Sequence, residues 1–123
     1  ASLPSGAMPT TLVTGATGLI GSHLVRALAE RGDGLRLLIR RDSDTSVLDG
    51  IEHDRVTGDI TDRRAVRRAV DGVDRVFHLA AANSLEPADA ERAFAVNAGG
   101  AALIAAEALA AGVSRLVHAS TGR

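Results

Sequence analysis

The sequence predicts an α/β protein in which helices cover both faces of a parallel sheet, a doubly wound arrangement. Short apolar runs alternate with segments whose apolar residues recur at helical spacing, and three glycines separate the first run from the first such segment. Strands and helices that alternate in this way form parallel strands joined by right-handed crossovers. We expect five strands in the spatial order 3-2-1-4-5, counted along the chain, as an incomplete sheet of this class.

Five apolar runs are the expected strands. The run "LRLLIR" is apolar enough to be buried on both faces, whereas "IEHDRVT" alternates and fits an edge of the sheet. The polar stretch "RDSDTSVLDG" between them is expected to be a loop with a short turn. The predicted strands are residues 11–14, 35–40, 51–57, 74–82 and 114–120.

Three helices are expected between the strands. The first covers residues 18–31, and Gly32 and Gly34 end it. Thr61 can cap the second, which lies in "TDRRAVRRAVDG". An alanine-rich third helix lies within residues 87–111, and Gly112 stops it. The apolar stripe of the first helix consists of Leu19, Ile20, Leu24, Val25 and Leu28.

The second helix is strongly two-sided. At about 100° per residue, its arginines fall on one face and its apolar residues on the other. A basic stripe could contact nucleic acid, but the formal net charge of −1 favours a solvated outer face. The arginines are Arg63, Arg64, Arg67 and Arg68, and the apolar residues are Ala65, Val66, Ala69 and Val70.

The composition narrows the class of protein. A chain of 123 residues, 46% hydrophobic and 24% charged, suits one globular domain with its own core. The absence of cysteine excludes disulfides and thiolate metal sites and makes the cytoplasm the expected compartment. We expect no secretory signal, no membrane span and no nucleic-acid or membrane partner. Residues 1–9 are interpreted as a flexible tail or a remnant of cloning, and residues 10–123 as the domain.

The glycine-rich turn indicates a dinucleotide site. Gly15, Gly18 and Gly21 form G-x-x-G-x-x-G between a strand and a helix. The first glycine allows a sharp turn, the second lets a pyrophosphate approach the bare backbone, and the third lets the helix pack close to the sheet. The start of the helix then offers N–H groups and the positive end of its dipole to the phosphates. The alternative, a tight turn with incidental glycines, explains the strand–turn–helix context less well.

The end of the second strand bears on the choice between NAD and NADP. An acidic residue there binds the ribose hydroxyls, whereas an arginine accepts the 2′-phosphate of NADP. Arg40 and Arg41 occupy this end, and Asp42 comes too late to be the natural acidic partner. Because a guanidinium can bind phosphate through two parallel hydrogen bonds, we expect NADP to be favoured over NAD. The alternative is that both arginines are solvated.

Several motifs together resemble one known family. "TLVTGATGLIGSHLVRAL" resembles the cofactor motif of the extended short-chain dehydrogenase/reductase family, also called the NAD-dependent epimerase/dehydratase family. "GDITD", "VFHLAA", "VNAGGA" and "VHAST" resemble its later motifs in order and spacing. The resemblance covers nearly everything from Thr10 onward and implies a Rossmann fold that binds NAD or NADP. "LIRRDSD" and the loop after it are most similar to the dihydroflavonol-reductase and hopanoid-associated sugar epimerase branch.

The resemblance implies roles for single residues. Asp59 would contact the adenine, although a residue at a strand end can also cap a turn or a helix. Asn97 would have a catalytic or site-structuring role, the alternative being an ordinary polar residue of the helix. Thr121, with Ser120 beside it, matches the residue that orients the substrate oxygen. The implied cofactor-binding residues are Gly15, Thr17, Gly18, Leu19, Ile20, Gly21, Arg40, Arg41, Asp59, Ile60, Leu79, Ala80 and Ala81.

The family's reaction also needs a tyrosine general acid/base and a lysine four residues later, and the chain contains neither. By resemblance, Tyr-x-x-x-Lys is expected roughly 20–30 residues beyond Thr121. Three explanations are open: the amino-terminal part of a longer enzyme, a minimal cofactor domain, or a divergent binder without catalysis. The first is favoured, because "STGR" directly follows a strand and a catalytic position. As given, the chain is expected to be inactive.

The parent enzyme would be an NAD(P)-dependent oxidoreductase or epimerase. Its small-molecule substrate would be a sugar nucleotide or a small ketone, and a homodimer is a candidate assembly. The alternative is a dinucleotide-binding or sensing module without chemistry.

The histidines show no metal-ligand spacing, so no metal site is expected. They are expected to have core or surface roles, with His78 and His118 on buried strands and His23 and His53 elsewhere. A serine hydrolase is disfavoured, since the chain has no G-x-S-x-G elbow.

Overall fold

The sheet has the expected topology. The computed structural model describes residues 9–79 and 87–118, and its five strands form one sheet in the order β3-β2-β1-β4-β5. Every neighbouring pair is parallel. The predicted α/β fold and strand order are therefore confirmed, with β3 at one edge. The strands are β1 (Thr10–Thr14), β2 (Gly34–Ile39), β3 (Asp54–Thr57), β4 (Arg75–His78) and β5 (Arg115–His118).

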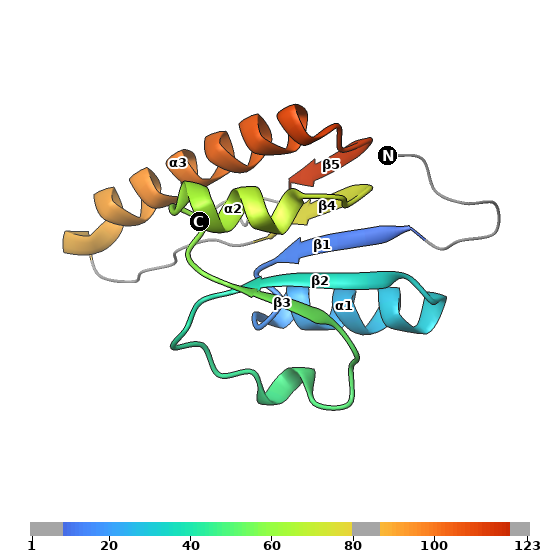
Figure 1. The fold of residues 1–123 in the computed structure, drawn as a ribbon. Helices are drawn as coiled ribbons and strands as arrows, with labels where there is room; N and C mark the ends of the chain where they lie inside the picture. The colour runs from blue at the N-terminus through green and yellow to red at the C-terminus, as the bar shows by residue number, and fades with distance from the viewer. Residues whose placement is uncertain (1–8, 80–86, 119–123) are drawn as a thin grey trace.

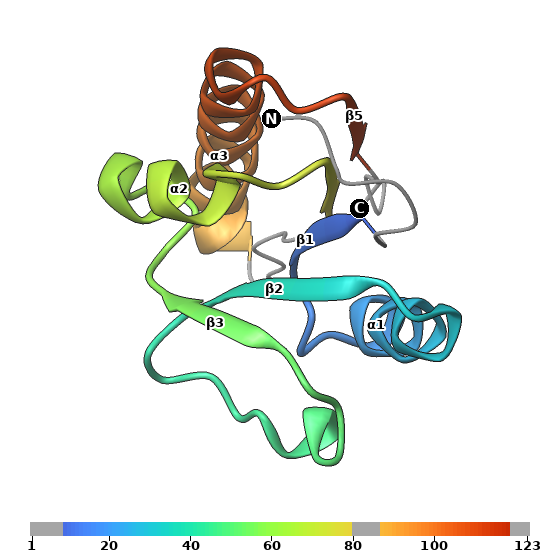
Figure 2. The same ribbon diagram turned by 45° about the vertical axis from the view of Figure 1, so that its right-hand side comes forward.

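Helices cover both faces of this sheet. Helix α1 (Leu19–Arg31) lies on one face, and α2 (Arg63–Val70) and α3 (Pro87–Ala111) lie on the other (Figures 1 and 2). A short 3-10 helix, η1 (Ser46–Leu48), interrupts the loop between β2 and β3, where a short turn was predicted. Within residues 9–79 and 87–118, no helix is both long enough and apolar enough to span a bilayer.

The two faces create two separate cores. Successive residues of a strand point to opposite faces, so neighbours in β1 join different clusters. Leu12 belongs to the cluster that contains Val66 of α2 and Ile104 of α3, whereas Val13 belongs to the cluster that contains Val25 of α1. The burial of β2 on both faces, predicted from its continuous apolar run, has the same cause. When helices cover both faces of a parallel sheet, the side chains on both faces of its strands are apolar.

Some predicted boundaries are wrong. The third strand starts at Asp54 instead of residue 51, because Ile51 donates its N–H to the Leu48 carbonyl and His53 bonds to the Ile51 carbonyl. These residues close the turn after η1 instead of pairing with β2. Gly34 does not end α1 but opens β2, while Gly32 alone ends the helix with φ 94°. The fourth and fifth strands are also shorter than predicted in the described residues, 75–78 and 115–118.

The predicted cap of α2 is wrong by one residue. Asp62, not Thr61, is the N-cap, and its carboxylate accepts a hydrogen bond from the Arg64 N–H at 3.0 Å. Thr61 is already engaged, because both its N–H and its hydroxyl donate to Asp59 Oδ1. Aspartate is also the stronger capping residue of the two.

The two-sided character of α2 is as predicted. Its arginine face is exposed and its alanine–valine face is buried against the sheet and α3. Arg67 Nε donates to Glu107 of α3 at 3.0 Å, and Arg63 lies 3.6 Å from the same carboxylate. Part of the arginine face therefore joins α2 to α3 across the outside of the molecule.

Candidate cofactor site

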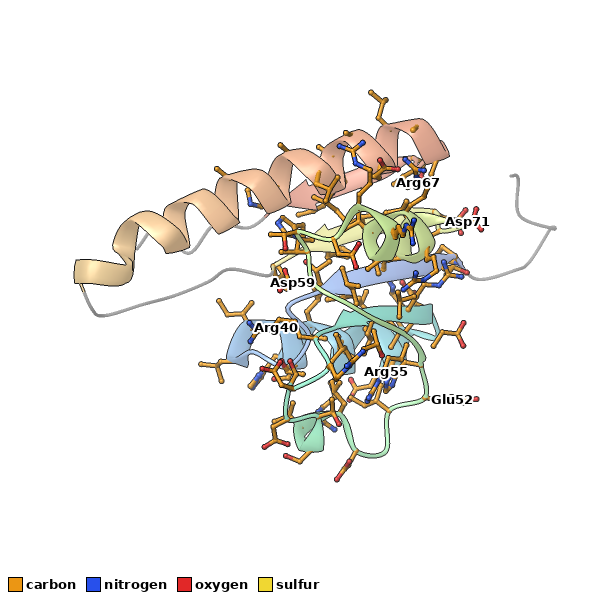
Figure 3. All side chains as sticks on the ribbon, turned by 60° about the vertical axis from the view of Figure 1, so that its left-hand side comes forward. Arg40, Glu52, Arg55, Asp59, Arg67 and Asp71 are labelled. Carbon is orange, nitrogen blue, oxygen red and sulfur yellow. The ribbon has the colours of Figure 1, made fainter. Side chains whose placement is uncertain are left out.

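The carboxyl ends of the parallel strands meet at one edge of the sheet. In doubly wound folds, ligands bind outside this edge. The predicted cofactor residues follow the ends of different strands here: Gly15 after β1, Arg40 after β2, Asp59 after β3 and Leu79 after β4. Figure 3 shows Arg40 and Asp59 on one side of the molecule and Glu52 and Asp71 on the opposite side. The fold thus gathers at one edge residues that are far apart in the sequence.

The first glycine produces the sharp turn. Gly15 follows β1 with φ 78°, in the left-handed region that other residues rarely adopt. The chain then turns back, and the Gly18 N–H donates to the Gly15 carbonyl at 3.1 Å. Gly18 is the N-cap of α1, so the helix starts at Leu19, four residues after Gly15.

Gly21 and Gly18 have different reasons to be glycine. A Cβ on Gly21 would lie 1.9 Å from the Gly15 carbonyl oxygen, so only glycine allows α1 to pack this close to the turn. A Cβ on Gly18 would meet only that same oxygen, at 3.4 Å, which is an ordinary contact. Gly18 also has a negative φ of −78°. Internal packing therefore explains the third glycine of the motif but not the second.

The start of α1 is open to an anion. No side chain caps the helix at Gly18, and its first turn contains no acidic residue. Leu19 and Ile20, which were expected in the apolar stripe of the first helix and also among the cofactor-binding residues, are 79% and 65% exposed. Their position in the first turn, above the edge of the sheet, leaves them outside the core. The free N–H groups and the helix dipole make this end suited to a phosphate.

Two arginines follow β2 at the same edge. Arg40 and Arg41 are exposed, and the Arg40 carbonyl accepts a hydrogen bond from the Ser43 N–H at 3.1 Å. Neither guanidinium has a hydrogen bond or an ion pair with another residue of the described ranges. Asp42, the next residue, is also exposed.

Asp59 caps a turn after β3. Its Oδ1 accepts from the N–H and the hydroxyl of Thr61, each at 3.0 Å. The turn-capping alternative is therefore observed. Oδ2 of Asp59 receives no hydrogen bond from the described residues, so the adenine contact stays a prediction. Ile60 packs on α3, where a Cβ on Gly100 would lie 2.9 Å from Ile60 Cγ1.

Sequence reasoning missed one polar contact at this edge. His78 was expected to be a core residue, and it is 1% exposed, but its Nδ1 lies 2.7 Å from the hydroxyl of Thr14. Burial, followed by the nearby His118, lowers the pKa of His78 to about 4. His118, predicted on a buried strand, is exposed, because β5 lies at an edge of the sheet. Part of the signal was available in the sequence: Thr14 ends the predicted first strand, whereas His78 lies inside the fourth strand as predicted, residues 74–82.

Other predicted site residues cannot be placed in the same way. Ala80, Ala81, Ser120 and Thr121 lie outside the described residues. Asn97 belongs to α3, whose backbone is described at this point but not the side chain. Across the described ranges, no three His, Cys, Asp or Glu side chains are grouped so that they could hold a metal ion.

Comparisons with known proteins agree with this geometry. Residues 11–123 match the family described as "NAD dependent epimerase/dehydratase family". The chain is 49% identical over 112 residues to sterol demethylase protein B of Methylococcus capsulatus, covering 91% of this chain and 34% of that protein. It is 38% identical over 109 residues to a putative dihydroflavonol 4-reductase of Synechocystis, covering 89% of this chain and 32% of that protein.

A solved structure gives the same result. A short-chain dehydrogenase/reductase superfamily protein from Agrobacterium tumefaciens, crystallised with bound NAD, superposes with a TM-score of 0.77 at 38% identity, covering 92% of this chain and 33% of that one. The chain thus spans about a third of the length of these relatives. From the family match, the identity to these relatives and the glycine turn at the edge of the sheet, we conclude that the chain belongs to the NAD-dependent epimerase/dehydratase family.

Proposed function

We propose that this chain is the dinucleotide-binding part of an NAD(P)-dependent oxidoreductase or epimerase that moves a hydride at a carbonyl or hydroxyl carbon. Membership of the family supports the dinucleotide and the enzyme class. The single observation that carries the site is Gly18. Neither a positive φ nor close packing requires glycine there, which supports a ligand in front of the bare backbone.

The residues at the edge of the sheet fit a dinucleotide. The N–H groups at the start of α1, together with Thr17, would hold the pyrophosphate, since the helix dipole is positive there. Asp59 and Ile60 would contact the adenine, and Leu79, with Ala80 and Ala81 after it, would line the cleft. A bound nicotinamide dinucleotide supplies the hydride chemistry.

The catalytic assignments rest on resemblance. Thr121, with Ser120 beside it, would donate a hydrogen bond that orients the substrate oxygen, and Asn97 would structure the site. The chain has no tyrosine and no lysine, so the whole protein would need its general acid and the group that lowers the pKa of that acid from another stretch of sequence. We expect the 123-residue chain alone to have no turnover.

A substitution at Gly18 tests the site. Gly18→Ala should weaken binding of NADPH and NADH at least about tenfold, because a methyl group would stand where the phosphates approach, while the melting temperature stays unchanged. Gly99→Ala is the matched control, because a Cβ at this exposed glycine of α3 has nothing within 4 Å. Fluorescence titration with both nucleotides measures the affinities. Wild-type affinity in Gly18→Ala would contradict the proposed site.

We further propose that NADP is preferred over NAD. The two exposed arginines after β2 support it, because a guanidinium binds a 2′-phosphate more strongly than a ribose hydroxyl. Arg40→Asp should lower the affinity for NADPH and leave the affinity for NADH unchanged or higher. Arg55→Asp is a control for the change in charge, since Arg55 is an exposed arginine of β3 and not of the proposed site. An unchanged NADPH affinity in Arg40→Asp would show that Arg40 does not bind the phosphate.

Of the two substrate classes, we propose a small ketone, or the corresponding alcohol, instead of a sugar nucleotide. Two relatives at 49% and 38% identity carry the names of a sterol demethylase protein and a dihydroflavonol reductase, and neither name refers to a sugar nucleotide. NADPH oxidation by the full-length protein, measured with a panel of cyclic ketones and of keto sugar nucleotides, separates the two classes.

The second candidate is a dinucleotide-binding or sensing module without chemistry. The open start of α1, with the bare backbone of Gly18, would serve such a module equally well. The mass of the intact natural protein decides between the two candidates: a longer chain with Tyr-x-x-x-Lys supports the enzyme, and a natural chain of this length supports the module.

A further inference from the structure

Three neighbouring strands end in a row of polar side chains. Thr14, His78 and His118 are the last residues of β1, β4 and β5, and the register pairs Thr14 with His78 and His78 with His118. Side chains two residues apart on a strand share a face. The row therefore lies on the face of the sheet that α2 and α3 cover, where Leu12 and Val76 are buried. We call these three residues the strand-end row.

Side chains connect the strands along this row. The hydroxyl of Thr14 lies 2.7 Å from Nδ1 of His78. The same hydroxyl oxygen accepts a hydrogen bond from the Leu79 N–H at 3.2 Å. The rings of His78 and His118 are stacked, with centroids 5.0 Å apart and planes inclined by 30°. The row thus adds side-chain contacts to the backbone pairing of the three strands at their carboxyl ends, directly before Gly15.

His78 is neutral in this environment. Its side chain is buried, and burial, followed by the nearby His118, lowers its pKa to about 4. A neutral imidazole has one nitrogen that accepts and one that donates. The Thr14 hydroxyl oxygen has two lone pairs, so the hydroxyl either donates to Nδ1 or accepts from a protonated Nδ1 beside the bond from Leu79; each neutral tautomer joins the two side chains.

We propose that His78 is a positioning residue for the dinucleotide: through the Thr14 hydroxyl it holds the start of the glycine turn against the end of β4 at Leu79. This inference rests on the proposed dinucleotide site. The turn and the end of β4 form two walls of that site, and a small displacement of one wall weakens contacts that depend on both. His118 supports His78 from β5 by stacking against its ring.

The experiment compares variants of the row in the full-length protein. Thr14→Val removes the hydroxyl and keeps the shape, and Thr14→Ser keeps the hydroxyl. Val76→Ala is the matched control for stability, because Val76 is buried on the same strand and face, two residues before His78. Affinity for NADPH and NADH is measured by fluorescence titration, and the melting temperature is measured for every variant.

We expect Thr14→Val to bind both nucleotides about five- to tenfold more weakly and Thr14→Ser to stay within about twofold of the wild type. Val76→Ala should lose stability and keep its affinity. The double variant Thr14→Val/His78→Leu should bind no more weakly than Thr14→Val, since Thr14→Val already lacks the hydrogen bond to His78. If Thr14→Val does not fold, His78→Leu and His78→Asn make the same comparison, because the asparagine amide can accept or donate a hydrogen bond near the position of Nδ1.

Three results would overturn the inference. A folded Thr14→Val with wild-type affinity would show that the hydrogen bond does not position the turn. If Val76→Ala has the same melting temperature as Thr14→Val and loses as much affinity, the row acts through stability alone. A wild-type protein that binds neither nucleotide would contradict the proposed function itself and this inference with it, whereas the first two results leave the proposed function intact.

Discussion

At the scale of single residues, the three glycines of the turn serve different physical purposes. The sequence predicted their roles because spacing and context were informative, but only the structure separates a glycine needed for packing from one that packing does not need. Gly21 meets the Gly15 carbonyl oxygen at a distance that excludes a Cβ, and Gly18 does not. Stability and binding should therefore respond to different substitutions.

The first prediction concerns Gly21. Gly21→Ala should lower the free energy of unfolding by about 3 kcal/mol or more, because the Cβ would overlap with backbone that cannot move without distorting the turn. Chemical denaturation of the full-length protein measures the change. Gly18→Ala serves as the comparison and should unfold like the wild type. Equal stability in the two variants would mean that α1 can shift away from β1.

Residue-scale prediction failed at the start of α2. Thr61 and Asp62 are both capping residue types, and sequence alone could not show that Asp59 would engage Thr61 first. Asp62→Ala should cost about 1 kcal/mol, the usual effect of losing a cap. Thr61→Val should cost less, since it removes only the side-chain part of the contact with Asp59. Urea denaturation compares them, and a larger effect of Thr61→Val would restore Thr61 as the cap.

At the scale of elements, periodicity predicted the helices well and the ends of the strands poorly. The bounds of α3, residues 87–111, were predicted because alanine-rich helical spacing runs up to a glycine that adopts φ 79°. The start of β3 was not, because alternation over residues 51–53 resembles a strand while the local hydrogen bonds of Ile51 and His53 form a turn. Short contacts within a loop leave little trace in a pattern of hydrophobicity.

The pairing of α2 with α3 gives an element-scale prediction. Arg67 donates to Glu107 at 3.0 and 3.4 Å, and this bond, with the charges of Arg67 and Arg63, lowers the pKa of the Glu107 carboxyl. Glu107→Gln should lower the melting temperature slightly, less than Asp62→Ala does, because both arginines are largely exposed to water. The loss should shrink in 1 M salt, as expected for a screened pair. A salt-independent loss would point to packing instead of charge.

At the scale of the whole molecule, polar clusters lie at both edges of the sheet. The strand-end row occupies the carboxyl edge. At the amino edge, the fully buried carboxylate of Asp33 bonds to Arg31 at 2.8 Å, to Arg75 at 2.6 Å and to the hydroxyl of Thr11 at 3.0 Å. This cluster joins the end of α1 to β1 and β4. No sequence pattern predicted it, because its members lie in different elements and share no spacing.

The amino-edge cluster should be important for stability and not for binding. Asp33→Asn should lower the free energy of unfolding by about 3 kcal/mol, because Arg75 would remain partly buried without a carboxylate. Affinity for NADPH should stay unchanged, since the proposed dinucleotide site lies at the other edge. Denaturation and titration of one sample measure both quantities. A stable variant with weakened binding would contradict this separation of the two edges.

The two clusters also predict how the stability of the whole molecule depends on pH. His78 has a folded pKa of about 4 against an ordinary value of 6.5. The unfolded chain therefore binds a proton first, and stability should fall as the pH drops from 6.5 to 4, by an amount on the order of 2 kcal/mol. The hydrogen bond from Arg31, with smaller contributions from Thr11 and Arg75, lowers the pKa of Asp33 below its usual 3.8. The contribution of the ionised Asp33 carboxylate to the free energy of unfolding is therefore complete above pH 3.8 and is lost only at lower pH.

The effects of His78 and Asp33 on stability can be separated by substitution, because the two groups titrate in different pH ranges. Urea denaturation of the full-length protein between pH 7 and pH 3 should show a gradual loss of stability below pH 6.5 in the wild type. His78→Gln removes the titrating ring, so its stability should change less between pH 6.5 and 4 while the steep loss at lower pH remains. Asp33→Asn should have the opposite effect and keep the upper slope. If His78→Gln loses as much stability as the wild type between pH 6.5 and 4, the buried ring of His78 is not the group that couples folding to protons. The neutral state of His78 in the strand-end row would then lose its support.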